Sequence, residues 1–307
     1  MAKIKVIAIV GPTASGKTEL SVKLAKRLNG EIISADSMQI YKNIPIATAV
    51  PTNVEKENVP HHLMEFLELG DSFSVAQYVK LATEKIKEVN KNGKLPIIVG
   101  GTGLYVDSLL LGTNFFEEDT TKIRAVLELE AEQKGIEALF ERVKQMDPEY
   151  AAKLHINDKK RIIRALEMME YHKRTVTSLN KEAISKESPF DVCFIGINYE
   201  DRQKLYDRIN RRVDLMLENG LLEEAKQTFN KKLSKTSAQA IGHKELYCYF
   251  KGEVSLEEAA EKLKMETRRY AKRQLTWFKR NQNINWIMAD SQENILQAAL
   301  EIIEREI

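Results

Sequence analysis

The sequence predicts an α/β fold in which a parallel sheet forms the core and an all-helical segment is inserted into it. Short apolar runs such as Val6–Val10 alternate with helical patterns in the first part of the chain, as is typical of parallel sheets. Residues 115–189 carry only helical patterns, and the strand-like run 192–197 follows them. The predicted domains are a core with the C-terminal helices, 1–114 and 190–307, and a helical insertion, 115–189.

The first apolar run leads directly into a glycine-rich octapeptide. Its residues are Gly11, Pro12, Thr13, Ala14, Ser15, Gly16, Lys17 and Thr18. The spacing G-x-x-x-x-G-K-[ST] lets consecutive backbone N–H groups surround a phosphate, because glycine permits angles and approaches that a side chain would block. Lys17 would reach the distal phosphate and the Thr18 hydroxyl would bind Mg²⁺. The octapeptide therefore predicts a P-loop NTPase-like core resembling that of ATP-binding proteins, without identifying the phosphate compound.

A second strand is predicted at 31–35, and it ends at Asp36. Ligands bind at the carboxyl ends of strands in open α/β sheets, so Asp36 is placed to face the P-loop. An Asp after a strand is also a common helix N-cap, and its position alone leaves both roles open. His61 and His62 come later, without further clustered ligands, which favours packing or hydrogen bonding over a metal site.

A third strand is predicted at 95–99, after a helical pattern at 73–89, and it runs into Gly100-Gly101-Thr102-Gly103. The glycines are compatible with a backbone packed against a ligand and equally with a tight strand-to-helix turn. Motor ATPases and GTPases normally have an apolar strand that ends in an Mg²⁺-holding Asp. This strand ends in glycines, which favours a group-transfer enzyme.

Helical patterns account for most of the remaining chain. They cover residues 121–134, 136–146, 148–154, 158–172, 201–219, 223–229 and 256–280. Breaks at Gly135, Asp147-Pro148 and Gly220 separate them, since glycine and proline interrupt helices.

Composition limits the class of protein. A chain of 307 residues with 43% hydrophobic residues can bury a sizeable core and favours two domains over one. No run of about 18 apolar residues occurs, so we expect no membrane association and a cytoplasmic location. Two cysteines in unlike contexts, Cys193 and Cys248, argue against a disulfide framework.

The net charge is only +2, but basic residues gather in three helical patterns. They are Lys159, Lys160, Arg161 and Arg164; Arg202, Lys204, Arg208, Arg211 and Arg212; and Lys262, Lys264, Arg268, Arg269, Lys272, Arg273, Lys279 and Arg280. One such cluster is as readily a solvated helix face. Three of them favour a polyanion such as RNA as a partner.

Six motifs in this order resemble those of the bacterial tRNA dimethylallyltransferases, the tRNA isopentenyltransferase family. They are the P-loop, Ser34 to Tyr41, Val99 to Tyr105, Lys160 to Glu167, Gln239 to Glu245 and Arg273 to Phe278. His243 departs from the pattern, in which Tyr is expected. The resemblance implies transfer of a dimethylallyl group from dimethylallyl diphosphate to N6 of adenosine 37, in tRNAs reading codons that begin with U.

The resemblance also implies roles for individual residues. Asp36 is the candidate base, Thr102 would hold the same amine, and Lys17 and the P-loop would bind the diphosphate with Mg²⁺ on Thr18. Arg211 and Arg212 are candidate diphosphate ligands, although spacing does not show which turns inward.

The anticodon stem-loop of tRNA is the expected macromolecular partner, gripped by the insertion, and a monomer is expected. The residues expected to contact tRNA are Asp36, Ser37, Met38, Gln39, Thr102, Arg124, Lys159, Lys160, Arg161, Ile162, Ile163 and Arg164.

Three other classes share some of these features. A P-loop kinase of a nucleoside or small metabolite would use the loop and Asp36 but not three basic helices. An RNA-binding NTPase would need an Mg²⁺-holding strand-end Asp and a water-positioning residue. An enzyme that prenylates free adenine nucleotide would have little use for the insertion.

Overall fold

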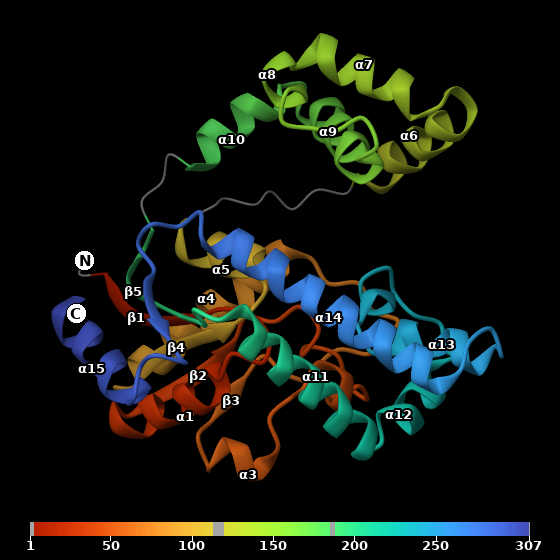
Figure 1. Cartoon of the computed structure of the whole chain (residues 1–307). Helices are drawn as coiled ribbons and strands as arrows, with labels where there is room; N and C mark the ends of the chain where they lie inside the picture. Colours follow the sequence, from red (N-terminus) through yellow and green to blue (C-terminus); the bar gives the residue numbers. More distant parts are fainter. Residues whose placement is uncertain (1–2, 113–119, 185–187, 307) are drawn as a thin grey trace. The chain divides into compact units, whose positions relative to one another are not determined.

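The chain forms two compact units (Figure 1). The structure, a computed structural model, describes residues 3–112, 120–184 and 188–306. One unit comprises Met1–Leu110 with Ser188–Ile307, and the other comprises Leu111–Glu187. The sequence-based limits of the second unit were 115–189; position 115 lies outside the described residues. We refer to these as the core unit and the helical unit.

The core unit is built on a six-stranded parallel sheet in the order β3-β2-β4-β1-β5-β6, which confirms the predicted α/β class. Its strands are β1 Ile4–Val10, β2 Gly30–Ser34, β3 His61–His62, β4 Leu95–Gly100, β5 Phe190–Asn198 and β6 Asn285–Met288. The register places Val10 beside both Gly100 and Gly196. The chain segments that follow β1, β2 and β4 therefore emerge at one edge of the sheet.

Both faces of the sheet are buried, which explains the continuous apolar runs. Val6, Ala8 and Val10 point into one core, which includes residues of α4, α5 and α14. Ile7 and Ile9 point into another core, which is shared with α1 and α15. Helices thus cover the sheet on both sides.

The helices agree with most of the predicted ranges. In the core unit they are α1 Lys17–Arg27, α2 Pro45–Thr48, α3 Asn53–Lys56, α4 Val75–Lys91, α5 Gly103–Leu110, α11 Arg202–Glu218, α12 Leu221–Thr228, α13 His243–Phe250, α14 Leu256–Phe278 and α15 Ile295–Glu306. In the helical unit they are α6 Thr121–Lys134, α7 Ile136–Met146, α8 Pro148–Ala151, α9 Lys159–His172 and α10 Val176–Ile184. None of the helices among the described residues is long and apolar enough to cross a membrane.

The elements that the sequence did not predict are mainly at edges and ends. Strands β3 and β6 are the outer strands. Strand β3 has two residues, both histidine. Strand β6 has four residues, of which only Ile287 is buried, so its short run Trp286-Ile287-Met288 did not indicate a strand. The histidines of β3 do hydrogen bond: His61 Nδ1 donates to the Val59 carbonyl at 2.8 Å, and His62 Nε2 lies 2.6 Å from Glu31.

Candidate active site

The P-loop has the strained backbone that its glycines allow. It connects β1 to α1, with φ of +143° at Gly11 and +99° at Gly16. A Cβ on Gly11 would lie 2.4 Å from the Ile197 carbonyl oxygen of the neighbouring strand. Only glycine fits there, so the loop is held close to the sheet with the positive end of α1 directed to its hollow.

Lys17, the first residue of α1, is folded back over the loop. Its Nζ donates to the Pro12 carbonyl at 2.6 Å and lies 3.5 Å from Ser15 Oγ. Burial, and then the charge of Arg212, lower the pKa of Lys17 from 10.5 to about 7, while Asp36 opposes the shift. A bound anion would strongly favour the charged form of this amine.

Asp36 lies just beyond β2 and faces the P-loop, as predicted from its position. Its Oδ1 accepts hydrogen bonds from the backbone N–H of Met38 at 2.8 Å and Gln39 at 3.4 Å. These bonds resemble a helix N-cap, but no helix begins there. Burial raises the pKa of Asp36, against the opposing effects of these bonds and of Lys17 and Arg212. Burial therefore makes its carboxylate a stronger base than an exposed one.

Thr102 lies beside Asp36 at the end of the next strand. Its Oγ1 accepts from the Ser37 N–H at 3.0 Å and donates to Ser37 Oγ at 3.3 Å. The Thr102 N–H donates to the Ala35 carbonyl at 3.2 Å. Because β2 and β4 are neighbours in the sheet, Asp36 and Thr102 meet although they are distant in sequence.

The glycines around Thr102 pack against protein atoms. A Cβ on Gly100 would lie 2.1 Å from the Ala35 carbonyl oxygen, and one on Gly101 would lie 2.0 Å from Gln274 Nε2. A Cβ on Gly103 would lie 2.2 Å from Trp277 Cδ1. Close approach of β2 and α14 thus explains all three, and no ligand is needed to account for them.

The three arginines of the α11 face have different positions. Arg212 lines the site and its Nη1 donates to Thr13 Oγ1 at 3.4 Å. Arg208 is exposed, although its Nε donates to the Ala14 carbonyl at 2.9 Å. Arg211 is exposed and lines neither cavity. Arg211 and Arg212 were both predicted as candidate diphosphate ligands. Consecutive helix residues point about 100° apart, and Arg212 is the one of the two that lines the cavities, so the prediction is corrected for Arg211.

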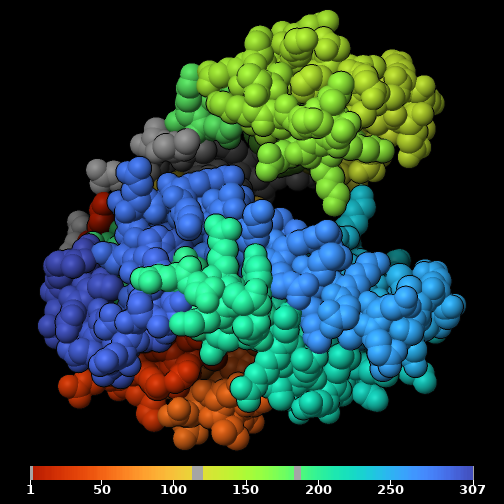
Figure 2. Space-filling model, viewed as in Figure 1, coloured from red at the N-terminus to blue at the C-terminus, as the bar shows by residue number. Residues whose placement is uncertain are grey.

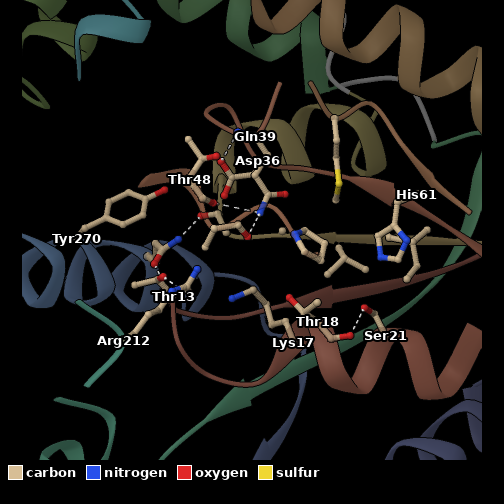
Figure 3. Close-up of a pocket in the computed structure, with 18 residues that line it drawn as sticks. Thr13, Lys17, Thr18, Ser21, Asp36, Gln39, Thr48, His61, Arg212 and Tyr270 are labelled. Atoms are coloured by element: carbon tan, nitrogen blue, oxygen red, sulfur yellow. Dashed lines mark hydrogen bonds between the residues drawn. The ribbon is translucent and has the colours of Figure 1, made fainter. Parts of the chain in front are cut away.

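Two cavities open on the P-loop edge of the sheet. The smaller, about 80 Å³, is lined by Lys17, Thr18, Gln39 and His61 among others (Figure 3). The larger, about 290 Å³, extends between α2, α11, α13 and α14. Five residues line both cavities: Thr13, Asp36, Thr48, Arg212 and Tyr270. Asp36 thus lies where the smaller cavity, which the P-loop lines, adjoins the larger one.

Several residues of this site were not predicted. Tyr270 and Gln274 lie on α14, for which the sequence predicted only a helix that carries a basic cluster. Gln274 is 5% exposed, and a glutamine inside an otherwise apolar stripe was the available signal. Gln39 was expected to contact RNA, but its amide donates to the Thr48 and Ala49 carbonyls and accepts from Ser34 Oγ.

His243 lies inside the core unit, 4% exposed. Its Nε2 lies 2.9 Å from Glu224 Oε1, and its Nδ1 lies 3.0 Å from Thr228 Oγ1. Glu224 also accepts from the backbone N–H groups of Ile46 and Ala47 in α2. The residue that departs from the family pattern therefore supports a wall of the larger cavity.

The helical unit has its basic residues outside and its apolar residues inside. Lys159, Lys160, Arg161 and Arg164 are exposed at the start of α9. Ile162 and Ile163, at 0% and 2% exposed, belong to the core of the unit. Their predicted contact with tRNA is therefore wrong, because reaching a partner would require breaking this core.

The three arginines predicted to bind RNA also have partners within the helical unit. Arg124 Nη1 lies 3.2 Å and Arg164 Nη1 lies 2.6 Å from the buried carboxylate of Glu167. Arg161 Nε lies 3.4 Å from Asp158. The two pairs with Glu167 compensate the charge of a buried acid, which would be costly to bury alone.

The fold and the site define a P-loop α/β protein with an enclosed carboxylate beside its phosphate-binding loop. Comparison with protein families is more specific. The model of the IPP transferase family matches residues 39–281. The chain belongs to this family.

Individual relatives are similar along nearly the whole chain. A tRNA dimethylallyltransferase of Caldanaerobacter subterraneus subsp. tengcongensis is 48% identical over 94% of this chain and 92% of its own length. One from Bacillus subtilis is 49% identical over 92% and 90%, respectively.

Solved structures are similar to this chain as well. A tRNA isopentenylpyrophosphate transferase from Bacillus halodurans has a TM-score of 0.71 at 43% identity, covering 99% of this chain and 95% of that one. A eukaryotic dimethylallyltransferase acting on tRNA has a TM-score of 0.82 at 29% identity, covering 99% and 80%.

Proposed function

We propose that the protein transfers the dimethylallyl group of dimethylallyl diphosphate to N6 of adenosine 37 in tRNAs that read codons beginning with U. The products are N6-dimethylallyladenosine and diphosphate. The observation that carries the proposal is the meeting of Asp36, Thr102 and the P-loop at adjacent strand ends. The relatives named above bear the name of this reaction.

The adenine amine is a weak nucleophile because its lone pair is delocalised into the ring, so it needs a base and close positioning. The enclosed Asp36 carboxylate supplies the base, and the Thr102 hydroxyl holds the same amine. The N6–C1 bond forms as the C1–O bond to diphosphate breaks, and the N6 proton passes to Asp36. The larger cavity, near the lower limit of ordinary ligand pockets, receives the base.

The leaving diphosphate acquires negative charge as the C1–O bond breaks. Lys17, Arg212 and residues of the P-loop line the smaller cavity, where the diphosphate would bind. They stabilise the developing charge in an enclosed site, where fixed donors act more strongly than in water. Lys17 binds the diphosphate in its protonated form.

The residues of the smaller cavity fit the Mg²⁺ that P-loop proteins use. The Thr18 hydroxyl and the Asp36 carboxylate line the same space, and hard oxygen donors are what Mg²⁺ prefers. We assign Thr18 as its protein ligand. When bound, the ion neutralises diphosphate charge.

The exposed basic residues provide the binding surface for tRNA. Lys159 and Lys160 on α9 form no ion pair with any residue that the structure describes, and they contact phosphates of the anticodon stem, with Arg161 and Arg164 beside them. The core unit carries further exposed basic residues on α11 and α14, among them Arg208, Arg211, Lys272 and Arg273. These two helices lie side by side (Figure 2). Asp36, Ser37 and Met38 meet the target base, which must leave its stack to be enclosed.

The test is transfer of radiolabel from dimethylallyl diphosphate to unmodified tRNA with Mg²⁺, beside a reaction with ATP labelled in its terminal phosphate. We expect label on an adenosine next to the anticodon, with ATP unchanged. Phosphate passed to water or to a small acceptor, with tRNA unlabelled, would identify a kinase or NTPase instead. Label on free adenine nucleotide but not on tRNA would identify the nucleotide-prenylating class.

A further inference from the structure

Gln274 uses both ends of its buried side-chain amide to join two backbone segments. Its Oε1 accepts from the Thr13 N–H at 2.8 Å, and its Nε2 donates to the Gly101 carbonyl at 3.0 Å. Thr13 belongs to the P-loop, and Gly101 immediately precedes Thr102. A single side chain therefore spans the ends of β1 and β4.

These two segments are the two halves of the active site. The Thr13 hydroxyl accepts a hydrogen bond from Arg212, so the Thr13 segment belongs to the part of the site proposed to bind the diphosphate. Gly101 determines where the Thr102 hydroxyl lies, on the side of the amine. The Gln274 amide thus fixes one distance between the two backbone segments that would hold the leaving group and the nucleophile.

The position of Gln274 is itself fixed from the next turn of α14. Trp277 Nε1 donates to Asp107 Oδ2 of α5 at 2.6 Å, and its ring occupies the space that a Cβ on Gly103 would take. A Cβ on Gly101 would likewise overlap Gln274 Nε2, at 2.0 Å. Two glycines therefore let α14 approach closely enough for the amide to reach both backbone groups.

We propose that Gln274 is a positioning residue that sets the separation between the P-loop and Thr102, and so the approach of the adenine amine to the allylic carbon. This inference rests on the proposed function. Reacting atoms must be held about 3–3.5 Å apart, and a misplacement of 1 Å costs about 100-fold in rate. The role needs a donor and an acceptor at opposite sides of one planar group, which glutamine supplies.

The experiment compares Gln274→Met and Gln274→Glu with wild type, and with Gln297→Met as a matched control. Methionine has a similar length and no amide. Gln297 is an exposed α15 residue. Among the described residues, its side chain hydrogen bonds to Glu301 of its own helix alone. Single-turnover rates, and the dissociation constants of dimethylallyl diphosphate and tRNA measured separately, are the readouts.

We expect Gln274→Met to lower the transfer rate about 100-fold. Each dissociation constant should change less than about threefold, because the residue acts on the approach of the reacting atoms and not on substrate binding. Gln274→Glu keeps the acceptor for Thr13 but sets a carboxylate oxygen against the Gly101 carbonyl. Its rate relative to wild type should recover as the pH falls, because a protonated carboxyl group can donate to Gly101 as the amide does. Gln297→Met should match wild type.

Two results would overturn the inference alone: a Gln274→Met enzyme as fast as wild type, or one whose rate and both affinities fall together with its thermal stability. The second would mean that the amide only supports the fold. A wild type that binds both substrates yet transfers no label would overturn the proposed function, and this inference with it. The wild-type reaction thus separates the two failures.

Discussion

The core unit and the helical unit both carry basic residues suited to an anionic partner. The two units differ in whether these charged side chains are enclosed or exposed to solvent. Lys17, Asp36 and Arg212 are enclosed together, and burial moves the pKa of each away from its ordinary value. Lys159 and Lys160 are exposed on α9. Enclosed charges cost free energy to bury and can act on reacting atoms, whereas exposed charges serve attraction and are screened by salt.

The largest expected effect concerns Asp36, one of the enclosed charged residues of the core unit. Asp36→Ala should lower turnover by about two to four orders of magnitude, as the loss of a general base does. The affinity for tRNA should stay nearly unchanged, because exposed residues elsewhere supply most of it. Single-turnover transfer and filter binding measure the two quantities. Normal turnover would mean that Asp36 only orders the backbone N–H groups of Met38 and Gln39.

The next effect concerns the core of the helical unit. Ile162→Ala should lower the free energy of unfolding of that unit by about 2–5 kcal/mol, because it removes buried methylene and methyl groups. Loss of tRNA affinity should appear only as the unit unfolds. Thermal denaturation beside tRNA binding at low temperature tests this. Weakened binding by a variant that remains fully folded would restore Ile162 as a contact residue.

A pH dependence distinguishes Lys17 from the exposed lysines. Its pKa in the free protein is lowered to about 7, and a bound diphosphate raises it toward the ordinary value. Affinity for dimethylallyl diphosphate is therefore full below about pH 7 and falls as the pH rises, by up to about tenfold per unit. Isothermal titration between pH 7 and 9 measures the slope. Lys17→Met should bind weakly with no such slope, and an equal slope in that variant would exclude Lys17 as the cause.

The sequence predicted the site best where one residue type is required by local geometry. The P-loop glycines, Lys17 and Asp36 follow a strand directly, and their places in the fold follow from that strand. Arg211 and Arg212 are neighbours on one helix and differ in direction by about 100°. Which of them faces the site depends on how α11 packs, and the sequence does not show this. Ile162 and Ile163 sit inside a basic motif, and only the apolar spacing of α9 indicated that they are core residues.

Contacts between distant segments were beyond such reasoning. Gln274 lies 261 residues from Thr13 and 173 from Gly101, and no local pattern relates them. The outer strands β3 and β6, of two and four residues, were too short to give a distinct strand pattern. What the chain determines locally could be predicted, and what depends on the packing of α14 against the sheet could not.

The smallest expected effect concerns Lys159, one of the exposed charged residues of the helical unit. Lys159→Ala should weaken the binding of all tRNAs alike, by a few-fold, and reduce the slope of log affinity against log salt by about one, because one phosphate contact is lost. Turnover at saturating tRNA should be unchanged. Binding titrations at several salt concentrations measure this, with Lys181→Ala as a control, since Lys181 already pairs with Glu149 at 3.4 Å. A changed preference among tRNAs would mean that α9 reads sequence, and the division between reacting and binding charges would then fail in the helical unit.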